Sequence, residues 1–377
     1  MIKIVADENI ELVREAFADI GELSVLPGRK ISKKELLDAD ALLVRSVTKV
    51  NKDLLEGTKI RFVGTATIGN DHIDKEYLAS RKIFFTDAAG CNSDAVAEYV
   101  FTALFHLADK LQFNLNGKTL GIIGAGNIGS RVARMAVALG MSVLKNDPPL
   151  KRSTHREDYL ELDELMNADI ITLHVPLIKE GVDKTYHLFD RTRLKNLKDG
   201  TIIINTSRGP VIDNNELIKS IDEKNLIAVL DVWENEPDIN LELLEKVKLA
   251  TPHIAGYSLE GKVNGTIILY NSLCNFLKII PRWKPVLPKP QRDIINLPAT
   301  QIEKSLNEIF SHIYRIDEDD RNLRKIKDVE DSERGDFFDS LRKNYTLRRE
   351  LPNYKIKIDH EDKRLEKILK TFRCDII

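Results

Sequence analysis

The chain has 377 residues, with 57 lysine and arginine residues against 59 aspartate and glutamate residues. This length allows two or three domains, and the balanced charge argues against a nucleic-acid partner, because no basic field is present. No apolar run approaches the roughly 20 residues that a membrane span requires, and the opening MIKIVADENI lacks the features of a signal peptide. Three dispersed cysteines indicate neither a disulfide framework nor a zinc site. We therefore expect a cytoplasmic protein with no metal and no membrane partner.

Short apolar strands alternate with helical segments over the first 86 residues, which predicts a parallel sheet with crossover helices. The predicted strands are residues 2–6, 22–26, 41–44, 61–64 and 83–86. Two of them run into polar loops at the carboxyl edge of the sheet, where ligands of such sheets bind. The polar side chains of these loops are Arg45, Ser46, Thr48, Thr65 and Thr67. They suit an anionic substrate, although ordinary turns use the same residue types.

After a predicted helix over residues 94–112, the chain carries its clearest motif. A strand at 120–123 leads into Gly124, Gly126 and Gly129, which have the spacing G-x-G-x-x-G, and a helical pattern follows. Gly124 permits a tight turn, Gly126 lets the backbone approach a pyrophosphate, and Gly129 lets helix and strand pack closely. The N-terminus of the helix offers N–H groups to the phosphates. A glycine-rich turn without a ligand is the alternative.

The next apolar run, residues 141–144, leads to Asp147. A carboxylate at this place accepts hydrogen bonds from the ribose 2′-hydroxyl and repels a 2′-phosphate, so the sequence favours NAD over NADP. Further buried strands are predicted at 169–173, 201–204 and 226–230, each followed by a polar loop. One edge of a single parallel sheet thus collects Gly124, Asp147, Val175, Arg208, Asp231 and His253.

The Pro-rich stretch Pro281 to Pro290 is typical of a linker, and a small α+β domain is expected beyond it. Its helices are predicted at 302–313, 336–344 and 364–372, with a capping box from Thr300 to Glu303 and a strand at 354–358. A basic cluster is most simply a solvated or ion-paired face, with contact to an anionic ligand in a neighbouring subunit as the alternative. It comprises Arg342, Lys343, Arg348 and Arg349.

The polar groups at the sheet edge suit the oxidation of a hydroxy acid. His253 is the natural base, because its ordinary pKa lies near neutrality. A carboxylate at Glu236 or Glu234 would hold its imidazole in one tautomer, and spacing alone does not decide between them. Arg208 can bind a substrate carboxylate through two hydrogen bonds. A loop histidine and surface charges with no catalytic role remain the alternative.

Four segments, GIIGAGNIG, NTSRGPVID, DVWENEP and TPHIAGYS, resemble the D-isomer-specific 2-hydroxyacid dehydrogenase family. The resemblance covers essentially the whole chain and implies Arg208, Glu236 and His253 as the catalytic residues. It implies substrate contacts from Ser46, Thr67 and Tyr257, and NAD as the cofactor. The NAD-binding residues expected from the motif and the resemblance together are Gly124, Gly126, Asn127, Ile128, Gly129, Asp147, Val175, Thr206, Asp231 and Gly256. Valine at position 175 departs from the threonine usual among the most similar members, so a hydroxyl contact to the cofactor is lost.

The resemblance also implies an α/β fold with three parts. Residues 96–255 would form a Rossmann-type, doubly wound NAD-binding domain, and residues 1–95, completed by 256–285, a flavodoxin-like substrate-binding domain. Residues 286–377 would form an α+β domain that makes a homodimer. We expect an NAD-dependent oxidation of a small phosphorylated hydroxy acid. The alternatives are another 2-hydroxyacid dehydrogenase, such as one acting on 3-phosphoglycerate, and a non-enzymatic NAD-sensing interaction protein.

Overall fold

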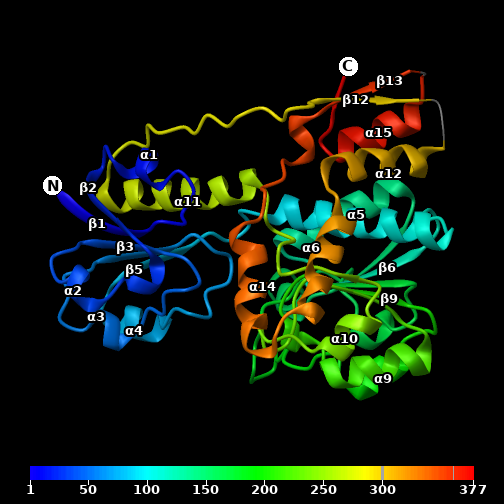
Figure 1. Cartoon of the computed structure of the whole chain (residues 1–377), viewed down its shortest axis with the longest axis horizontal. Helices are drawn as coiled ribbons and strands as arrows, with labels where there is room; N and C mark the ends of the chain where they lie inside the picture. Colours follow the sequence, from blue (N-terminus) through cyan, green and yellow to red (C-terminus); the bar gives the residue numbers. More distant parts are fainter. Residues whose placement is uncertain (299–300, 360) are drawn as a thin grey trace. The chain divides into compact units, whose positions relative to one another are not determined.

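The computed structural model describes residues 1–298, 301–359 and 361–377, and the chain divides into two compact units (Figure 1). Unit 1 consists of residues 1–92 and 258–288, and unit 2 of residues 93–257 and 289–377. The C-terminal segment therefore belongs to the same unit as the glycine motif, and the three domains expected from the sequence stay a prediction. Among the described residues, none of the helices combines the length and the apolar character of a membrane span.

Unit 1 is built on a five-stranded parallel sheet in the order β2-β1-β3-β4-β5. Its strands are β1 (Ile2–Asp7), β2 (Gly21–Leu26), β3 (Ala41–Val44), β4 (Phe62–Thr65) and β5 (Phe84–Asp87). Its helices are α1 (Val13–Phe17), α2 (Lys33–Leu36), α3 (Lys52–Leu55), α4 (Lys75–Ser80) and α11 (Leu259–Leu277). Ile4 packs with α11 in one core and Val5 lies in a second core, as expected where side chains alternate between the faces of a strand. All five strands predicted here are confirmed, each to within one residue.

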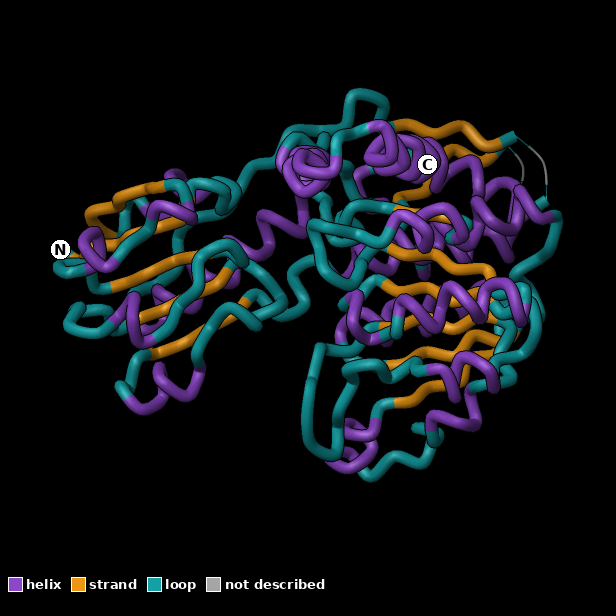
Figure 2. Tube along the Cα trace, turned by 60° about the horizontal axis from the view of Figure 1, so that its bottom comes forward, coloured by secondary structure: helices purple, strands orange, loops and turns teal. Residues whose placement is uncertain are grey.

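Unit 2 contains a six-stranded parallel sheet in the order β11-β10-β9-β8-β6-β7, with helices around it (Figure 2). Its strands are β6 (Thr119–Ile123), β7 (Ser142–Asn146), β8 (Ile170–Leu173), β9 (Ile202–Asn205), β10 (Ile227–Leu230) and β11 (Leu249–Ala250). Its helices are α5 (Ser93–Leu111), α6 (Asn127–Leu139), α7 (Pro148–Thr154), α8 (Arg191–Asn196), α9 (Asn214–Lys224) and α10 (Leu241–Lys246). The chain enters the sheet at β6, adds β7 on one side and then β8, β9, β10 and β11 in turn on the other, so the doubly wound Rossmann topology is confirmed.

Within its described residues, the C-terminal part of unit 2 contains a small parallel sheet and four α-helices. The strands are β12 (Ile294–Leu297), β13 (Lys355–Ile358) and β14 (Asp375–Ile376). The helices are α12 (Ile302–Ile313), α13 (Ile316–Arg324), α14 (Arg334–Lys343) and α15 (Lys363–Thr371). Phe310 of α12 packs on Phe105 of α5, with ring centroids 5.1 Å apart, so this part shares a core with the six-stranded sheet.

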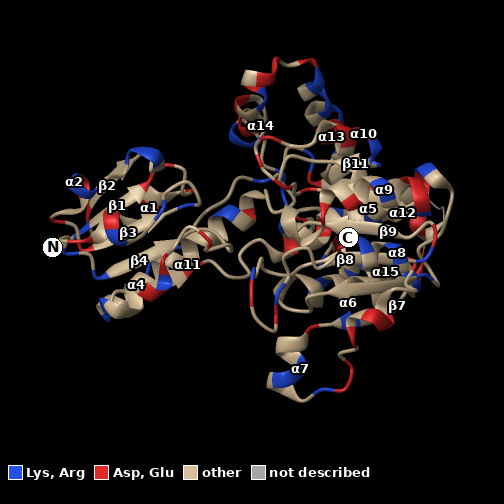
Figure 3. Cartoon of the chain, turned by 90° about the horizontal axis from the view of Figure 1, so that it is seen from below, with Lys and Arg blue, Asp and Glu red and all other residues tan. Residues whose placement is uncertain are grey.

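The capping box predicted from Thr300 to Glu303 begins at Thr300, which lies outside the described residues, so it stays a prediction. The carboxylate of Glu303 accepts hydrogen bonds from the backbone N–H groups of Leu115, at 2.9 Å, and Asn116, at 3.0 Å. Glu303 therefore ties α12 to the loop before β6. Basic and acidic residues are interspersed over the ribbon of each unit (Figure 3), in keeping with the balanced composition.

Candidate functional site

Glu236 and His253 form a hydrogen-bonded pair at the carboxyl edge of the six-stranded sheet. The Nδ1 atom of His253 lies 2.7 Å from Oε2 of Glu236, and the other carboxylate oxygen accepts a hydrogen bond from the N–H group of Trp233 at 2.8 Å. Burial is the largest single influence on the pKa of Glu236 and raises it. The charge of His253 and these hydrogen bonds lower the pKa, and together they outweigh burial, so the pKa lies below the ordinary value of a glutamate. Because Nδ1 is bound to Glu236, Nε2 is the ring nitrogen that the predicted role of His253 as a base would use.

The structure decides between the two candidate carboxylates. Oε1 of Glu234 lies 2.7 Å from Nε2 of His187, and its Oε2 accepts the N–H group of Asn214 at 2.9 Å. Glu234 is thus engaged elsewhere, and Glu236 is the acid that pairs with His253. The partner of Glu234 is therefore His187.

Three neighbouring strands bring the predicted catalytic residues to this edge. Arg208 follows β9, Glu236 follows β10 and His253 follows β11, and these strands are adjacent in the sheet. Gly209 allows the first two loops to meet, because a Cβ atom there would lie only 1.9 Å from the carbonyl carbon of Trp233. The guanidinium of Arg208 donates a hydrogen bond to the carbonyl of Ser207 at 2.7 Å.

Asp231 holds the loop of residues 251–257, which carries His253. The Asp231 carboxylate is 1% exposed and accepts hydrogen bonds from the N–H groups of Ile254 and Ala255, at 2.7 and 3.0 Å, and from the Thr251 hydroxyl at 2.6 Å. Burial raises the pKa of Asp231, and these donors act against it. Asp231 therefore anchors the loop that carries His253, and its contact with NAD stays a prediction.

Arg348 supports the same loop from the C-terminal segment. It is 7% exposed, and its guanidinium donates hydrogen bonds to the carbonyls of Ile254 at 3.1 Å, of Ala95 at 3.2 Å and of Ala255. It also lies 4.3 Å from the ring centroid of Tyr314. The prediction of a solvated or ion-paired basic face is therefore wrong for Arg348, because backbone carbonyls of distant segments bind its charge.

The glycine motif has the geometry that a dinucleotide requires. Gly124 has φ of 87° at the end of β6, a conformation that side chains disfavour. Gly126 is exposed at the N-cap of α6, and a Cβ atom there would meet no described atom within 4 Å apart from its chain neighbours. Asn127 and Ile128 form the first turn of this helix, which has no side-chain cap. The backbone is open to a pyrophosphate here, so these residues fit NAD.

Asp147 lies at the end of β7, beside the glycine turn. Its carboxylate accepts hydrogen bonds from the N–H groups of Ala125 at 2.9 Å and Leu150 at 3.0 Å. These bonds hold the Asp147 carboxylate against the glycine turn, at the end of the strand where the sequence predicts a contact with the ribose of NAD.

The remaining predicted NAD contacts lie on other loops of the same edge. Val175 follows β8, and Gly256 lies in the loop of residues 251–257. The hydroxyl of Thr206 is 3.3 Å from Nδ1 of His174, and the hydroxyl of Thr172 is 3.0 Å from Nε2 of the same ring. Burial lowers the pKa of His174 to about 3, so this ring is neutral at physiological pH. Thr206 thus has a partner within the protein, and its contact with NAD remains a prediction.

The predicted substrate contacts come from both units. Ser46 is exposed in the turn after β3, and the hydroxyl of Thr67 lies 2.8 Å from that of Thr65 and donates to the carbonyl of Gly69 at 2.8 Å. Tyr257 of unit 2 packs edge-on against Tyr345, with ring centroids 5.9 Å apart. Their contacts with substrate stay predictions.

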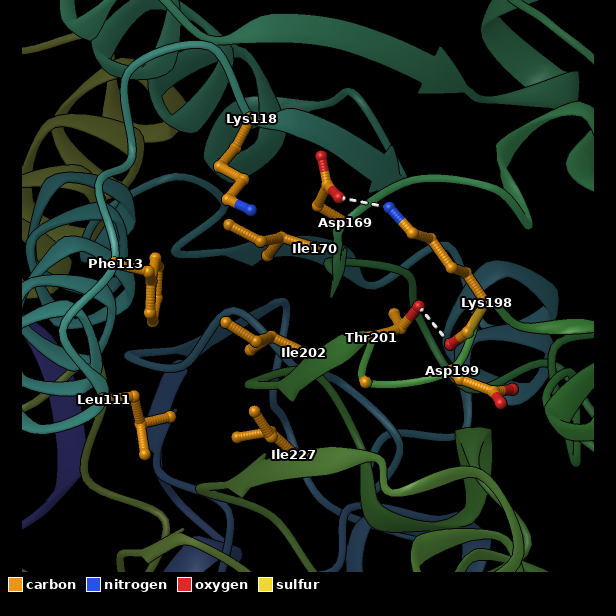
Figure 4. Close-up of a pocket in the computed structure, with 11 residues that line it drawn as sticks. Leu111, Phe113, Lys118, Asp169, Ile170, Lys198, Asp199, Thr201, Ile202 and Ile227 are labelled. Atoms are coloured by element: carbon orange, nitrogen blue, oxygen red, sulfur yellow. Dashed lines mark hydrogen bonds and ion pairs between the residues drawn. The ribbon is translucent and has the colours of Figure 1, made fainter.

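A pocket at the opposite, amino-terminal edge of the same sheet contains none of the predicted site residues (Figure 4). Apolar side chains such as Phe113 and Ile202 line it together with Lys118 and an ion pair. In this pair, Nζ of Lys198 lies 2.7 Å from Oδ1 of Asp169. The pocket lies at the edge of the sheet away from the glycine turn and from the His253–Glu236 pair.

Comparisons with known proteins identify relatives over the whole chain. A family described as "D-isomer specific 2-hydroxyacid dehydrogenase, NAD binding domain" matches residues 105–255, and a domain of unknown function matches residues 286–371. The chain is 45% identical over 365 residues to erythronate-4-phosphate dehydrogenase of an Enterobacter species, covering 96% of this chain and 95% of that protein. The protein of the same name from Shewanella violacea is 47% identical, with 93% of each chain covered.

Solved structures of related enzymes have the same fold. A D-lactate dehydrogenase from Aquifex aeolicus, complexed with NAD and lactic acid, is 30% identical with a TM-score of 0.60, covering 73% of this chain and 95% of that chain. An NAD-bound 3-phosphoglycerate dehydrogenase from Entamoeba histolytica is 28% identical with a TM-score of 0.63, covering 74% and 95%.

Proposed function

We propose that this chain, which belongs to the erythronate-4-phosphate dehydrogenases of the D-isomer-specific 2-hydroxyacid dehydrogenase family, oxidises 4-phospho-D-erythronate to 2-oxo-3-hydroxy-4-phosphobutanoate. The reaction is a step of pyridoxal 5′-phosphate biosynthesis, and NAD is the cofactor. The family resemblance seen in the sequence motifs is confirmed by relatives 45% identical over 96% of the chain. The observation that carries the chemistry is the 2.7 Å pair of His253 and Glu236 on the same sheet edge as the glycine turn.

Each catalytic residue has one task in this reaction. NAD, when bound, supplies the acceptor for the hydride that leaves C2 of the substrate. Nε2 of His253 takes the proton of the C2 hydroxyl, and the carboxylate of Glu236 stabilises the imidazolium that results. The guanidinium of Arg208 binds the C1 carboxylate and fixes C2 relative to the base.

The structure around this site favours an enzyme over a non-catalytic NAD sensor. A protein that only binds NAD has no need of a histidine paired with a partly buried acid on the same sheet edge as the glycine turn. The rival substrate, 3-phosphoglycerate, has weaker support, because the solved 3-phosphoglycerate dehydrogenase is 28% identical whereas the erythronate-4-phosphate dehydrogenases reach 47%.

NADH fluorescence with two substrates side by side tests this function. The purified full-length protein and NAD are mixed with 4-phospho-D-erythronate or with 3-phospho-D-glycerate. We expect NADH to form much faster with the first. Faster reduction of NAD with 3-phospho-D-glycerate would transfer the assignment to that substrate, and cofactor binding without NADH from either would favour the sensor.

The site residues and the assembly state form part of the same proposal. Ser46, Thr67 and Tyr257 would contact the substrate, and a homodimer would form through the C-terminal segment. β12 supports the dimer, since it is an edge strand and its Ile294 is 48% exposed.

A cytoplasmic location of the protein suits a reaction that draws on the cellular NAD pool. The proposed dimer can be tested directly. Light scattering of the full chain should give the mass of two copies, and a monomer at micromolar concentration would contradict the dimer.

A further inference from the structure

Helix α14 of the C-terminal segment brings Arg342 next to Tyr257. Nη2 of Arg342 lies 3.4 Å from the Tyr257 hydroxyl, and Nη1 lies 3.7 Å from the carboxylate of Asp339. The Arg342 side chain is only 26% exposed, and its Nε is buried with no hydrogen-bond partner among the described residues. A guanidinium has five N–H donors, so both contacts together leave Arg342 poorly satisfied.

Arg342 also acts electrostatically on the catalytic pair. Its positive charge is one of the influences that lower the pKa of Glu236, although burial and His253 act more strongly. The Glu236 carboxylate already binds His253 at 2.7 Å and the N–H group of Trp233 at 2.8 Å. The carboxylates of Glu236 and Asp339 in turn stabilise the positive charge of Arg342, so a partly buried cation lies close to the catalytic site.

The proposed substrate carries two anionic groups, one at each end of its four-carbon chain. Arg208 is assigned to the C1 carboxylate, which leaves the phosphate on C4 in need of a cation. An arginine suits this role, because its planar guanidinium binds phosphate oxygens through paired, charge-assisted hydrogen bonds. Arg342 has an unpaired Nε for this purpose and lies beside Tyr257, a predicted substrate contact.

The origin of Arg342 in the chain agrees with this role. The D-lactate dehydrogenase from Aquifex aeolicus was solved with lactic acid, which has no phosphate. Its match with this chain covers 95% of that protein but only 73% of this chain. Arg342 lies in the segment of residues 286–371, outside the matched NAD-binding domain. Resting on the proposed function, we propose that Arg342 binds the phosphate group of the substrate and sets the preference for a phosphorylated acid.

Arg342→Gln and Arg342→Lys test this assignment, with Lys343→Gln as the matched control. Lys343 is the next residue on α14, is exposed, and loses the same charge. We measure kcat and KM with 4-phospho-D-erythronate and with D-erythronate, which lacks the phosphate. Dissociation constants of both acids from the protein–NADH complex replace these values where turnover is too slow. Circular dichroism checks the fold of each variant.

We expect Arg342→Gln to lower the preference for the phosphorylated acid by about 10- to 150-fold, mainly through KM, as for a lost hydrogen bond to a charged group. Arg342→Lys should restore part of it, and Lys343→Gln should retain it fully. An unchanged preference in Arg342→Gln would overturn the proposal. An equal loss of kcat/KM with both acids, together with a shifted pH profile of kcat, would also overturn the proposal. Arg342 would then be a positioning residue for Glu236. A wild-type protein inactive with 4-phospho-D-erythronate would instead refute the proposed function.

Discussion

Replacement of Arg348 by methionine should destabilise the loop that carries His253. The substitution keeps most of the buried volume but removes the donors to the carbonyls of Ile254, Ala255 and Ala95. Each buried carbonyl left without a donor costs about 1–3 kcal/mol. Arg348 is 7% exposed, so water replaces these donors poorly; the three carbonyls together would cost about 3–9 kcal/mol, and relaxation of the loop keeps the loss near the lower end of that range. We therefore expect the free energy of unfolding to fall by about 3–5 kcal/mol.

Urea unfolding measures this loss, and hydrogen exchange of residues 251–257 locates it. Lys343→Met is the control, because Lys343 is exposed and its loss should change the free energy of unfolding by less than about 0.5 kcal/mol. Arg348→Met should also speed exchange at the Ile254 and Ala255 amides, which bind Asp231. A variant with wild-type exchange and a free energy of unfolding within about 0.5 kcal/mol of wild type would refute the reasoning.

Three further predictions concern the carboxyl edge of the sheet. His253→Ala should lower kcat by about 10²- to 10⁴-fold with an unchanged circular dichroism spectrum, and near-normal turnover would end its role as the base. Asp147→Ala should raise the KM for NAD by about tenfold and weaken the preference over NADP, because a carboxylate beside the ribose is lost; unchanged cofactor kinetics would contradict this. The pKa of Glu236 is lowered, so its stabilising effect is present above the ordinary pKa of a carboxyl group and is lost as the pH falls through the lowered value. Glu236→Gln should therefore flatten the acid side of the stability profile, and a curve parallel to wild type would exclude this effect.

The central strands of the two larger sheets could be predicted from the sequence because they are buried on both faces. Residues such as Ile170 and Ile203 belong to uninterrupted apolar runs, which indicate strands without reference to the rest of the chain. The C-terminal segment was harder to predict. Helix α13 (Ile316–Arg324) buries only Ile316 and Leu323 among many charges, and β14 has two residues, so neither has a clear local pattern.

The site was predictable wherever spacing along the chain decides the geometry. The glycine motif and Asp147 lie on consecutive elements, and both occur where the spacing placed them. The choice between Glu234 and Glu236 depends on tertiary contacts instead, because His187 engages Glu234 from a distant loop. Arg348 was missed for the same reason: a run of basic residues does not reveal which of them will be buried.

The central claim is that this chain moves a hydride from C2 of 4-phospho-D-erythronate to NAD while His253 removes the hydroxyl proton. A single-turnover experiment with equal amounts of protein and NAD, and with substrate deuterated at C2, measures this transfer without any later step. The account predicts NADH that carries one deuterium from the wild-type protein, and at most a trace from His253→Ala on the same timescale. Unlabelled NADH, or equal transfer by the two proteins, would contradict it.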